Sequence, residues 1–375
     1  MKISGIIAEF NPFHGGHGYL ISKAREKSDA VIAVMSGNFV QRGDCAVFPK
    51  FQRARDCVAR GIDLCIELPC VYALSSAQNF ARGAVSILNA LNCIDYLFFG
   101  SEIGDLSALL TVADALENPT EDFKAALSGA LKEGLPYPAA VEAAVSTQCG
   151  SADVLSSPNN TLAVEYLRAL KFYSSAISPV TIKREGAGYN SISLNERYPS
   201  ASALRAAVLK GESLKILNIT CEGKPTFIKA FDIICAARLK TISKEELCLL
   251  PDCNEEIAVR LKKASKHNTF DEIVQSTVCK SYTESRIRRI LCNMMVANTF
   301  KVFPEPTYIR PLAFNKTGAE VIKQIKEKAS LPVIDRGALL LSDDIFRLEC
   351  RCSDIYSLAC GEPGGSEISQ SAVLI

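Results

Sequence analysis

The stretch Glu9–Tyr19, EFNPFHGGHGY, decides how the first part of this chain folds. It contains two of only three histidines in 375 residues, His14 and His17, with two glycines between them. The apolar run KISGIIAEF leads into it, and GYLISKAREKS, with helical spacing, continues from it. The pattern predicts a buried strand, a glycine turn and the start of a helix. The N-terminus of such a helix presents free N–H groups and a positive dipole end, which favour a phosphate.

Four further apolar runs alternate with helical patterns downstream of this stretch. They are DAVIAVMSG at 29–37, DLCIELP at 63–69, CIDYLFFGSE at 93–102 and SPVTIKREG at 178–186. Near-continuous apolar character is typical of parallel strands that are covered on both faces. Strands that alternate with helices in this way predict an α/β fold with a Rossmann-like, doubly wound parallel sheet.

Three polar loops fall where such a sheet binds its ligands, at the carboxyl ends of the strands. The first holds His14 and His17, the second is SGNFVQRGD at 36–44, and the third is GSE at 100–102. Imidazole donors placed after the first strand can stabilise charge that develops on an α-phosphate during a displacement. We therefore predict that His14 and His17 are catalytic.

The composition excludes several classes of protein. A net charge of +1 argues against a nucleic-acid binder that is basic throughout, and no apolar run approaches the length of a membrane span. The N-terminus reads as a first strand rather than a signal peptide, so we expect a cytoplasmic protein. Fifteen scattered cysteines without a Cys-x-x-Cys pair predict reduced, mostly buried thiols and no metal site.

The pattern changes twice along the chain. From about 103 to 150 it is helical and amphipathic, and from about 212 onward it is again mainly helical. We therefore predict a nucleotide-binding domain at 1–211, with a helical insertion at 103–150, and a mainly helical region at 212–375. Between 257 and 303 nine Lys or Arg residues face three Asp or Glu residues. Such an excess indicates either a solvated face or a surface for nucleic-acid phosphates.

The histidine stretch resembles the His-x-Gly-His signature of the HIGH nucleotidyltransferase superfamily. Further segments resemble one branch of it, the tRNA(Met) cytidine acetate ligase family, in order along nearly the whole chain. These segments are GIIAEFNPFHGGH (5–17), VMSGNFVQRGD (34–44), DLCIELPCVYALSSAQNFARGAV (63–85), FGSE (99–102), SPNNTLAVEYLRAL (157–170), YPSASALR (198–205), KSYTESRIRRIL (280–291) and YIRPLAFNKTGAEVI (308–322).

The resemblance implies an activity. Members of this family use ATP, with Mg²⁺, to activate acetate as acetyl-adenylate. They then pass the acetyl group to the exocyclic amine of the wobble cytidine of elongator tRNA(Met). The resemblance also implies an ATP-binding loop made of Ile7, Ala8, Glu9, Phe10, Asn11, Pro12, Phe13, His14, Gly15, Gly16, His17, Gly18, Tyr19 and Leu20. The further ATP contacts that it implies are Gly100, Asn159 or Asn160, Arg184, Ser202 and Arg205.

Some roles stay open at this point. Ser200 or Ser202 caps the helix that follows, and Ser202 is better placed as a cap than as a ligand. The second loop is either a solvated turn or brings Arg42 or Lys50 to the transferring phosphoryl group or the tRNA, and we carry Lys50 as a catalytic candidate. Glu102 either helps to hold Mg²⁺ or caps a helix.

Two features concern the tRNA and the rival functions. The predicted contacts to tRNA phosphates are Lys262, Lys263, Arg286, Arg288 and Arg289. A small-molecule adenylyltransferase of the same superfamily would share the histidine loop but would need no long basic extension. A noncatalytic RNA-binding protein would not need both histidines.

Two residues of the histidine stretch, Gly18 and Leu20, depart from the commonest family pattern. Gly18 is expected to weaken the helix start by about 1 kcal/mol relative to alanine.

Overall fold

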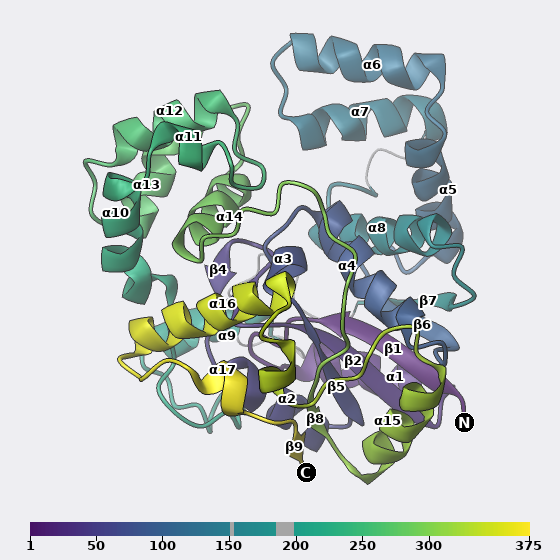
Figure 1. Ribbon diagram of the computed structural model, residues 1–375. Coiled ribbons are helices and arrows are strands. Elements are labelled where there is room, and N and C mark those ends of the chain that lie inside the picture. The colour runs from purple at the N-terminus through teal and green to yellow at the C-terminus, as the bar shows by residue number, and fades with distance from the viewer. Residues whose placement is uncertain (151–153, 185–198) are drawn as a thin grey trace.

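A seven-stranded sheet forms the centre of the molecule (Figure 1). The structure is a computed structural model that describes residues 1–150, 154–184 and 199–375. The strand order is β7-β6-β1-β2-β5-β8-β9. The bounds are β1 Ile3–Ala8, β2 Ala30–Ser36, β5 Leu64–Leu68, β6 Tyr96–Ser101, β7 Ser178–Lys183, β8 Pro311–Phe314 and β9 Val373–Leu374. The first five strands are parallel to one another, which confirms the predicted α/β fold.

Helices cover both faces of the sheet. Successive side chains of a strand point to opposite faces, so Val31 and Ala33 pack on one side while Ile32 and Val34 pack on the other. This double burial explains why β2 is apolar at every position but its last. The first face carries α1 Gly15–Arg25 and α2 Lys50–Ala59; the second carries α4 Ala77–Ala90, α8 Pro158–Phe172 and α15 Lys316–Lys328.

The direction in which the chain adds strands reverses next to β1. From β1 it proceeds through β2 to β5, and then returns to add β6 and β7 on the opposite side of β1. The loops after β1 and β6 therefore diverge and leave a crevice between them at the carboxyl ends of these strands. The histidine stretch follows β1 directly, so the fold places it in this crevice.

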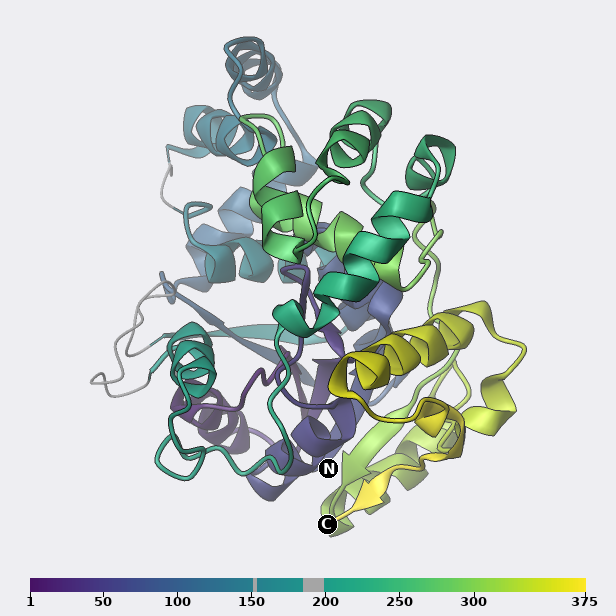
Figure 2. The same ribbon diagram turned by 90° about the vertical axis from the view of Figure 1, so that its left-hand side faces the viewer.

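Two helical groups project from the same end of the molecule in both views (Figure 1, Figure 2). The first is the predicted insertion, with α5 Leu106–Glu117, α6 Glu121–Lys132 and α7 Tyr137–Cys149. The second contains η1 Ile228–Phe231, α10 Asp232–Thr241, α11 Lys244–Leu247, α12 Glu255–Ala264, α13 Phe270–Thr277 and α14 Glu284–Met295. The short strands β3 Phe39–Val40 and β4 Asp44–Cys45 form a small hairpin, and α3 Cys70–Ala73 and α9 Ala201–Leu209 complete this part of the chain.

The C-terminal part of the chain returns to the sheet. Strand β8 pairs antiparallel with β5, and β9 pairs parallel with β8. The prediction of a mainly helical region at 212–375 did not include these two strands. The remaining elements are η2 Gly337–Leu340, α16 Asp344–Cys360 and α17 Ser366–Ser369, and Figure 2 shows α16 crossing beside the sheet.

Two predictions from composition can be compared with these elements. All fifteen cysteines are free thiols, and eight of them are buried, as the sequence predicted. In the part of the chain that the structure describes, no helix is both long and apolar enough to cross a membrane.

Gly18 offers a direct test of the helix start. It lies in the first turn and a half of α1 with a helical backbone, and a Cβ added there would meet only the ring of Phe13, at 3.9 Å. We expect Gly18→Ala to raise the free energy of unfolding by about 0.5–1 kcal/mol, because alanine loses less conformational entropy on folding. Urea denaturation of the two proteins measures this difference, and a lower stability of the variant would contradict it.

Candidate active site

The crevice contains a cavity of about 200 Å³, which we call the site cavity. Its lining includes most of the predicted ATP-site residues. These are Ile7, Ala8, Glu9, Phe10, Asn11, His14, His17, Leu20, Gly100, Asn159, Arg184, Ser202 and Arg205. The loop after β1, the end of β6 and the starts of α8 and α9 therefore converge on one space, as parallel-sheet topology predicts.

The two imidazoles are held by the backbone of the helix that they begin. His14 is the N-cap of α1, and its Nδ1 accepts the N–H of Gly16 at 3.1 Å. His17 Nδ1 accepts the N–H of His14 at 3.2 Å, which completes a reciprocal capping box. The rings stack with their centroids 3.7 Å apart. Phe10 and Phe13 pack against the His17 ring, at centroid distances of 4.9 and 5.5 Å.

Both imidazoles are neutral at pH 7. Burial, followed by the charges of Arg184 and Arg205, lowers the pKa of His14 to about 3. Burial, followed by His14 and Arg184, also lowers the pKa of His17 well below its usual value. A neutral imidazole carries one proton, and each Nδ1 already accepts a backbone N–H, so the proton resides on Nε2. Each ring therefore has a fixed Nε2–H donor in the lining of the cavity.

The lowered pKa of His14 predicts a pH dependence of stability. In the unfolded chain His14 binds a proton near pH 6.5, whereas in the fold it does not, so the folded state loses stability as pH falls below 6.5. From pH 7 to 5.5 we expect His14 to account for a loss of about 1 kcal/mol. His14→Asn keeps a good N-cap without a titrating group, and urea titrations at both pH values should show a smaller loss. Equal losses would contradict the assignment.

Gly100 and Arg184 meet at the adjacent ends of β6 and β7. A Cβ on Gly100 would approach Arg184 Cγ to 3.2 Å, so a larger residue here would make the arginine side chain shift by a few tenths of an ångström. Glu102 accepts hydrogen bonds from Ser157 and from Asn159 Nδ2, the latter at 2.6 Å, and lies 3.6 Å from Arg184 Nε. Its carboxylate therefore contacts two of the residues that line the cavity, Asn159 and Arg184. It does not cap α5, whose N-cap is Asp105.

The neighbouring residue, Asn160, holds the backbone that follows β6 instead of lining the cavity. Asn160 is buried, and its Oδ1 accepts the N–H groups of Glu102 and Ile103 at 2.8 and 3.3 Å. Asn159 lines the cavity and Asn160 does not. The structure therefore brings only the first of the two alternative asparagines to the site.

Helix α9 brings Ser202 and Arg205 to the cavity. Its N-cap is Ser200, which accepts the N–H of Ala203 at 3.0 Å. Of the two candidate caps the structure uses Ser200, and Ser202 lines the cavity, so the expectation that Ser202 serves as a cap rather than at the site is wrong. Arg205 donates to the carbonyl of Asn11 at 2.9 Å and to Ser202 Oγ at 3.0 Å, which fixes its guanidinium beside the histidine loop.

Several predicted loop residues support the site cavity without lining it. Gly16 and Tyr19 line a smaller neighbouring hollow of about 60 Å³, which we call the side hollow. Pro12, Phe13, Gly15 and Gly18 line neither space.

Other residues line the site cavity although they are not among the ATP contacts that the resemblance implies. They are Gln41, Arg42, Phe80, Phe99, Leu162, Tyr166, Ser200 and Ala201. Most are apolar, and an apolar residue that faces a cavity has the same sequence signature as one that faces the core. For Gln41 and Arg42 the sequence does indicate a place near the site, since they belong to the second polar loop at the carboxyl ends of the strands. Of these two, Arg42 is the alternative to Lys50 that the sequence offers for the transferring phosphoryl group or the tRNA.

The structure does not bring Lys50 into the site cavity. Its side chain is 1% exposed and forms ion pairs with Glu67, with Glu349 at 3.4 Å and with Glu367 at 2.7 Å. Arg310 joins this buried cluster through Glu67 and Glu367.

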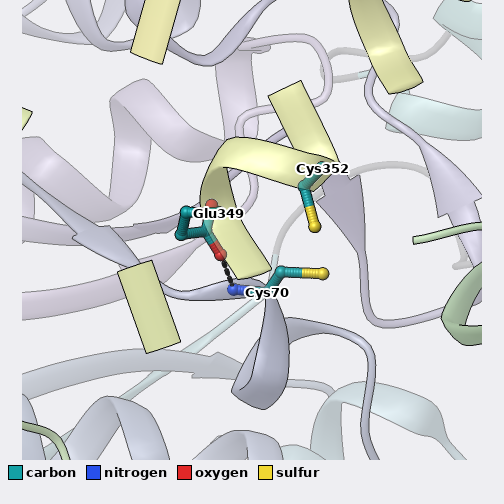
Figure 3. A group of neighbouring side chains, drawn as sticks. All are labelled: Cys70, Glu349 and Cys352. Carbon is teal, nitrogen blue, oxygen red and sulfur yellow. Dashed lines mark hydrogen bonds between the residues drawn. The ribbon is translucent and has the colours of Figure 1, made fainter. Parts of the chain in front are cut away.

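A group of possible metal-binding side chains borders this cluster. Cys70, Glu349 and Cys352 each offer a ligand-type atom, all within 4.8 Å of one another (Figure 3). The carboxylate, however, accepts the N–H of Cys70 and pairs with Lys50. Because its oxygens are already used and Lys50 supplies a positive charge, we assign these three side chains to the packing of α16 against α3.

The predicted tRNA contacts are mostly engaged with the protein itself. Arg288 pairs with Asp44, Asp271 and Glu284, and Arg289 is buried, 3.8 Å from Asp252.

The other three residues are on or near the surface. Arg286 donates to the carbonyl of Asp252, and Lys262 donates to the carbonyls of Leu239 and Ile242. Lys263 is exposed. The count of basic residues in this segment therefore overstates the charge that it presents to solvent.

Known proteins match this chain in sequence and in fold over nearly its whole length. A family model described as HIGH Nucleotidyl Transferase matches residues 1–370. The tRNA(Met) cytidine acetate ligase of Thermoanaerobacter sp. (strain X514) is 40% identical over 96% of each chain, and that of Acetivibrio thermocellus is 34% identical over 100% of each. Crystal structures of Thermotoga maritima TmcAL, apo and bound with alpha-thio ATP, align over 100% of both chains with TM-scores of 0.92 and 0.88 at 27% identity. The chain belongs to the HIGH nucleotidyl transferase family and, within it, to the family of the tRNA(Met) cytidine acetate ligases.

Proposed function

We propose that this chain is an ATP-dependent tRNA(Met) cytidine acetate ligase. It activates acetate as acetyl-AMP and acetylates the exocyclic amine of the wobble cytidine of elongator tRNA(Met). The observation that carries the proposal is the pair of neutral imidazoles, His14 and His17, with Nε2–H donors, in a cavity that Arg42, Arg184 and Arg205 also line. The names of the relatives at 34–40% identity support the same activity.

In the first step, an acetate oxygen attacks the α-phosphorus of ATP and pyrophosphate leaves. The step builds charge on the oxygens of the α-phosphate, where the Nε2–H groups of His14 and His17 donate. Arg184 and Arg205 provide the positive charge for the phosphates, and Gly100 lets the nucleoside approach the strand end. Asn159 completes the ATP contacts. The bound ATP analogue in the Thermotoga maritima structure supports ATP as the nucleotide.

The site cavity offers few ligands for the Mg²⁺ that accompanies ATP. Among the described residues that line the site cavity, Glu9 is the only carboxylate. Mg²⁺ prefers six oxygen ligands and usually binds through substrate phosphates, a few carboxylates and water. These side chains do not form a magnesium site of their own, so we treat the ion as part of the Mg-ATP substrate.

The second step needs tRNA, which we assign to the helical region at 212–375, with the ATP-binding domain at 1–211. Lys263 and the neighbouring basic residues support this assignment through their charge. We propose that the protein works in the cytoplasm, where tRNA is modified. No covalent enzyme intermediate is needed, because acetyl-AMP is itself an activated acyl donor.

Incubation with labelled acetate, Mg-ATP and bulk tRNA tests this function. We expect acetate-dependent release of pyrophosphate and, after digestion of the RNA, labelled N4-acetylcytidine. The absence of both products would refute the proposal. Pyrophosphate release with a small nucleotide acceptor and no label in RNA would support a small-molecule adenylyltransferase instead.

A further inference from the structure

The site cavity and the side hollow share the residues that would hold the phosphates. Both are lined by His14, His17, Leu20, Gly100 and Arg184. The imidazole pair therefore lies where the two spaces meet. On the proposed function, the α-phosphate binds at this junction, and the side hollow, which continues past Gly100 along the end of β7, receives the adenosine. The remaining half of the site cavity then lies beyond the α-phosphate and holds the pyrophosphate, beside Arg205, as well as the acyl group and its acceptor.

The lining of that remaining half combines the cations Arg42 and Arg205 with an apolar, aromatic wall made of Ile7, Phe80, Phe99, Leu162 and Tyr166. The rings of Phe99 and Tyr166 lie with centroids 5.8 Å apart, and both side chains are largely buried. An apolar, aromatic wall favours a pyrimidine ring and an acetyl methyl group over a charged phosphate. We call this half the acceptor half.

Among the described residues, Glu9 supplies the one carboxylate that lines the site cavity, and it does not line the side hollow. Its backbone is fixed, since the carbonyl of Glu9 accepts a hydrogen bond from the buried guanidinium of Arg53. Its Oε1 accepts the N–H of Gln41 at 2.9 Å, and the residue is half-buried. Burial raises the pKa of Tyr166, and the charge of Glu9 raises it further. A carboxylate held in this way can accept one more hydrogen bond from a ligand in the cavity.

We infer that Glu9 recognises the acceptor cytosine by accepting a hydrogen bond from its N4 amine and takes the proton that this amine loses. The inference rests on the proposed function and assigns Glu9 to the acceptor rather than to ATP. A carboxylate is the side chain that pairs with the N4–H₂ donor of cytosine, and it repels the O4 of uracil. The N4 lone pair of cytosine is delocalised into the ring, so an oriented acceptor of its proton helps the attack.

The step balances without a further reactant. N4 forms a bond to the acyl carbon of acetyl-AMP, and the carbonyl electrons move to oxygen. When the tetrahedral intermediate collapses, the bond between the acyl carbon and the phosphate oxygen breaks and AMP leaves with that electron pair. The proton from N4 passes to the Glu9 carboxylate and from there to water. N4-acetylcytidine, AMP and one proton are the products.

Glu9→Gln tests the inference in the full-length protein. Its amide oxygen can still accept the N–H of Gln41, so the loop keeps its anchor. We expect transfer of acetyl to tRNA(Met) to slow by about 100-fold or more, and acetate-dependent ATP–pyrophosphate exchange to fall by a much smaller factor. Wild type should bind tRNA(Met) more tightly than the same tRNA with uridine at the target position, and Glu9→Gln should lose this preference. Glu327→Gln, an exposed change on α15, is the matched control and should behave as wild type.

The outcomes separate this inference from the proposed function. If the wild-type protein shows neither acetate-dependent exchange nor transfer, the proposed function fails. If wild type is active and Glu9→Gln transfers acetyl at the wild-type rate, the inference alone is overturned. Equal losses of exchange and transfer would overturn it too, because Glu9 would then serve adenylate formation. Thermal unfolding of the variant at the wild-type temperature confirms that the comparison is between folded proteins.

Discussion

His17→Ala is expected to slow acetate-dependent ATP–pyrophosphate exchange by about 100- to 1,000-fold, the usual cost of removing one preorganised donor from a developing oxyanion. The donor is the Nε2–H that remains once Nδ1 accepts the N–H of His14. Binding of tRNA should stay within about twofold of wild type, because the proposed RNA surface lies in the helical region. Exchange assays and filter binding on the same preparation measure both quantities.

His17→Gln separates catalysis from folding. Glutamine is a common residue at the third position of a helix and can return the capping bond to the His14 N–H, while its amide keeps one N–H group. We expect the stability of the His17→Gln protein to match wild type and its exchange rate to lie between those of wild type and His17→Ala. If His17→Ala exchanges pyrophosphate at the wild-type rate, the imidazole does not act on the α-phosphate.

The sheet was largely predictable because each central strand is buried on both faces and therefore apolar along most of its length. The two outer strands on the C-terminal side were not. Strand β9 has two residues and β8 has four, which is too short for a recognisable alternation of apolar and polar residues. Because their partner strands also lie far away in the sequence, no local pattern predicts the pairing. The same limit applies to Asn159 and Asn160. Adjacent residues on a helix point about 100° apart, and only the orientation of α8 decides which one reaches the cavity.

The charged residues show a second limit of sequence reasoning. Arg288 belongs to the densest basic segment of the chain, yet it pairs with Asp44, which lies 244 residues earlier. A count along the sequence treats that arginine as free for an RNA phosphate, whereas the fold uses it to join α14 to the loop that carries Gln41 and Arg42. Lys50 also pairs with residues that lie far from it in the sequence, because the carboxylates around it come from β5, α16 and α17.

Lys50→Met is expected to lower the free energy of unfolding by about 3–5 kcal/mol, the usual cost of removing one partner from a buried ion-pair network. Burial by itself lowers the pKa of Lys50, but Glu367, Glu67 and Glu349 together raise it, so the lysine is charged in the fold. Without it, Arg310 alone faces three buried carboxylates. Urea denaturation measures the loss.

Glu349→Gln supplies the matched control for this change. Burial, followed by Glu67, raises the pKa of Glu349 to about 8, so a neutral amide is a mild replacement for this carboxyl. Glutamine also keeps an acceptor for the N–H of Cys70. Adding Glu349→Gln to Lys50→Met should therefore recover at least about 1 kcal/mol of the lost free energy of unfolding, because the two residues belong to one network and their effects do not add.

Below its unfolding temperature, the folded Lys50→Met protein should still exchange pyrophosphate at nearly the wild-type rate, since Lys50 does not line the site cavity. Loss of exchange at unchanged stability would instead show that Lys50 reaches the reacting phosphate, which requires a rearrangement of α16 and α17 away from β5.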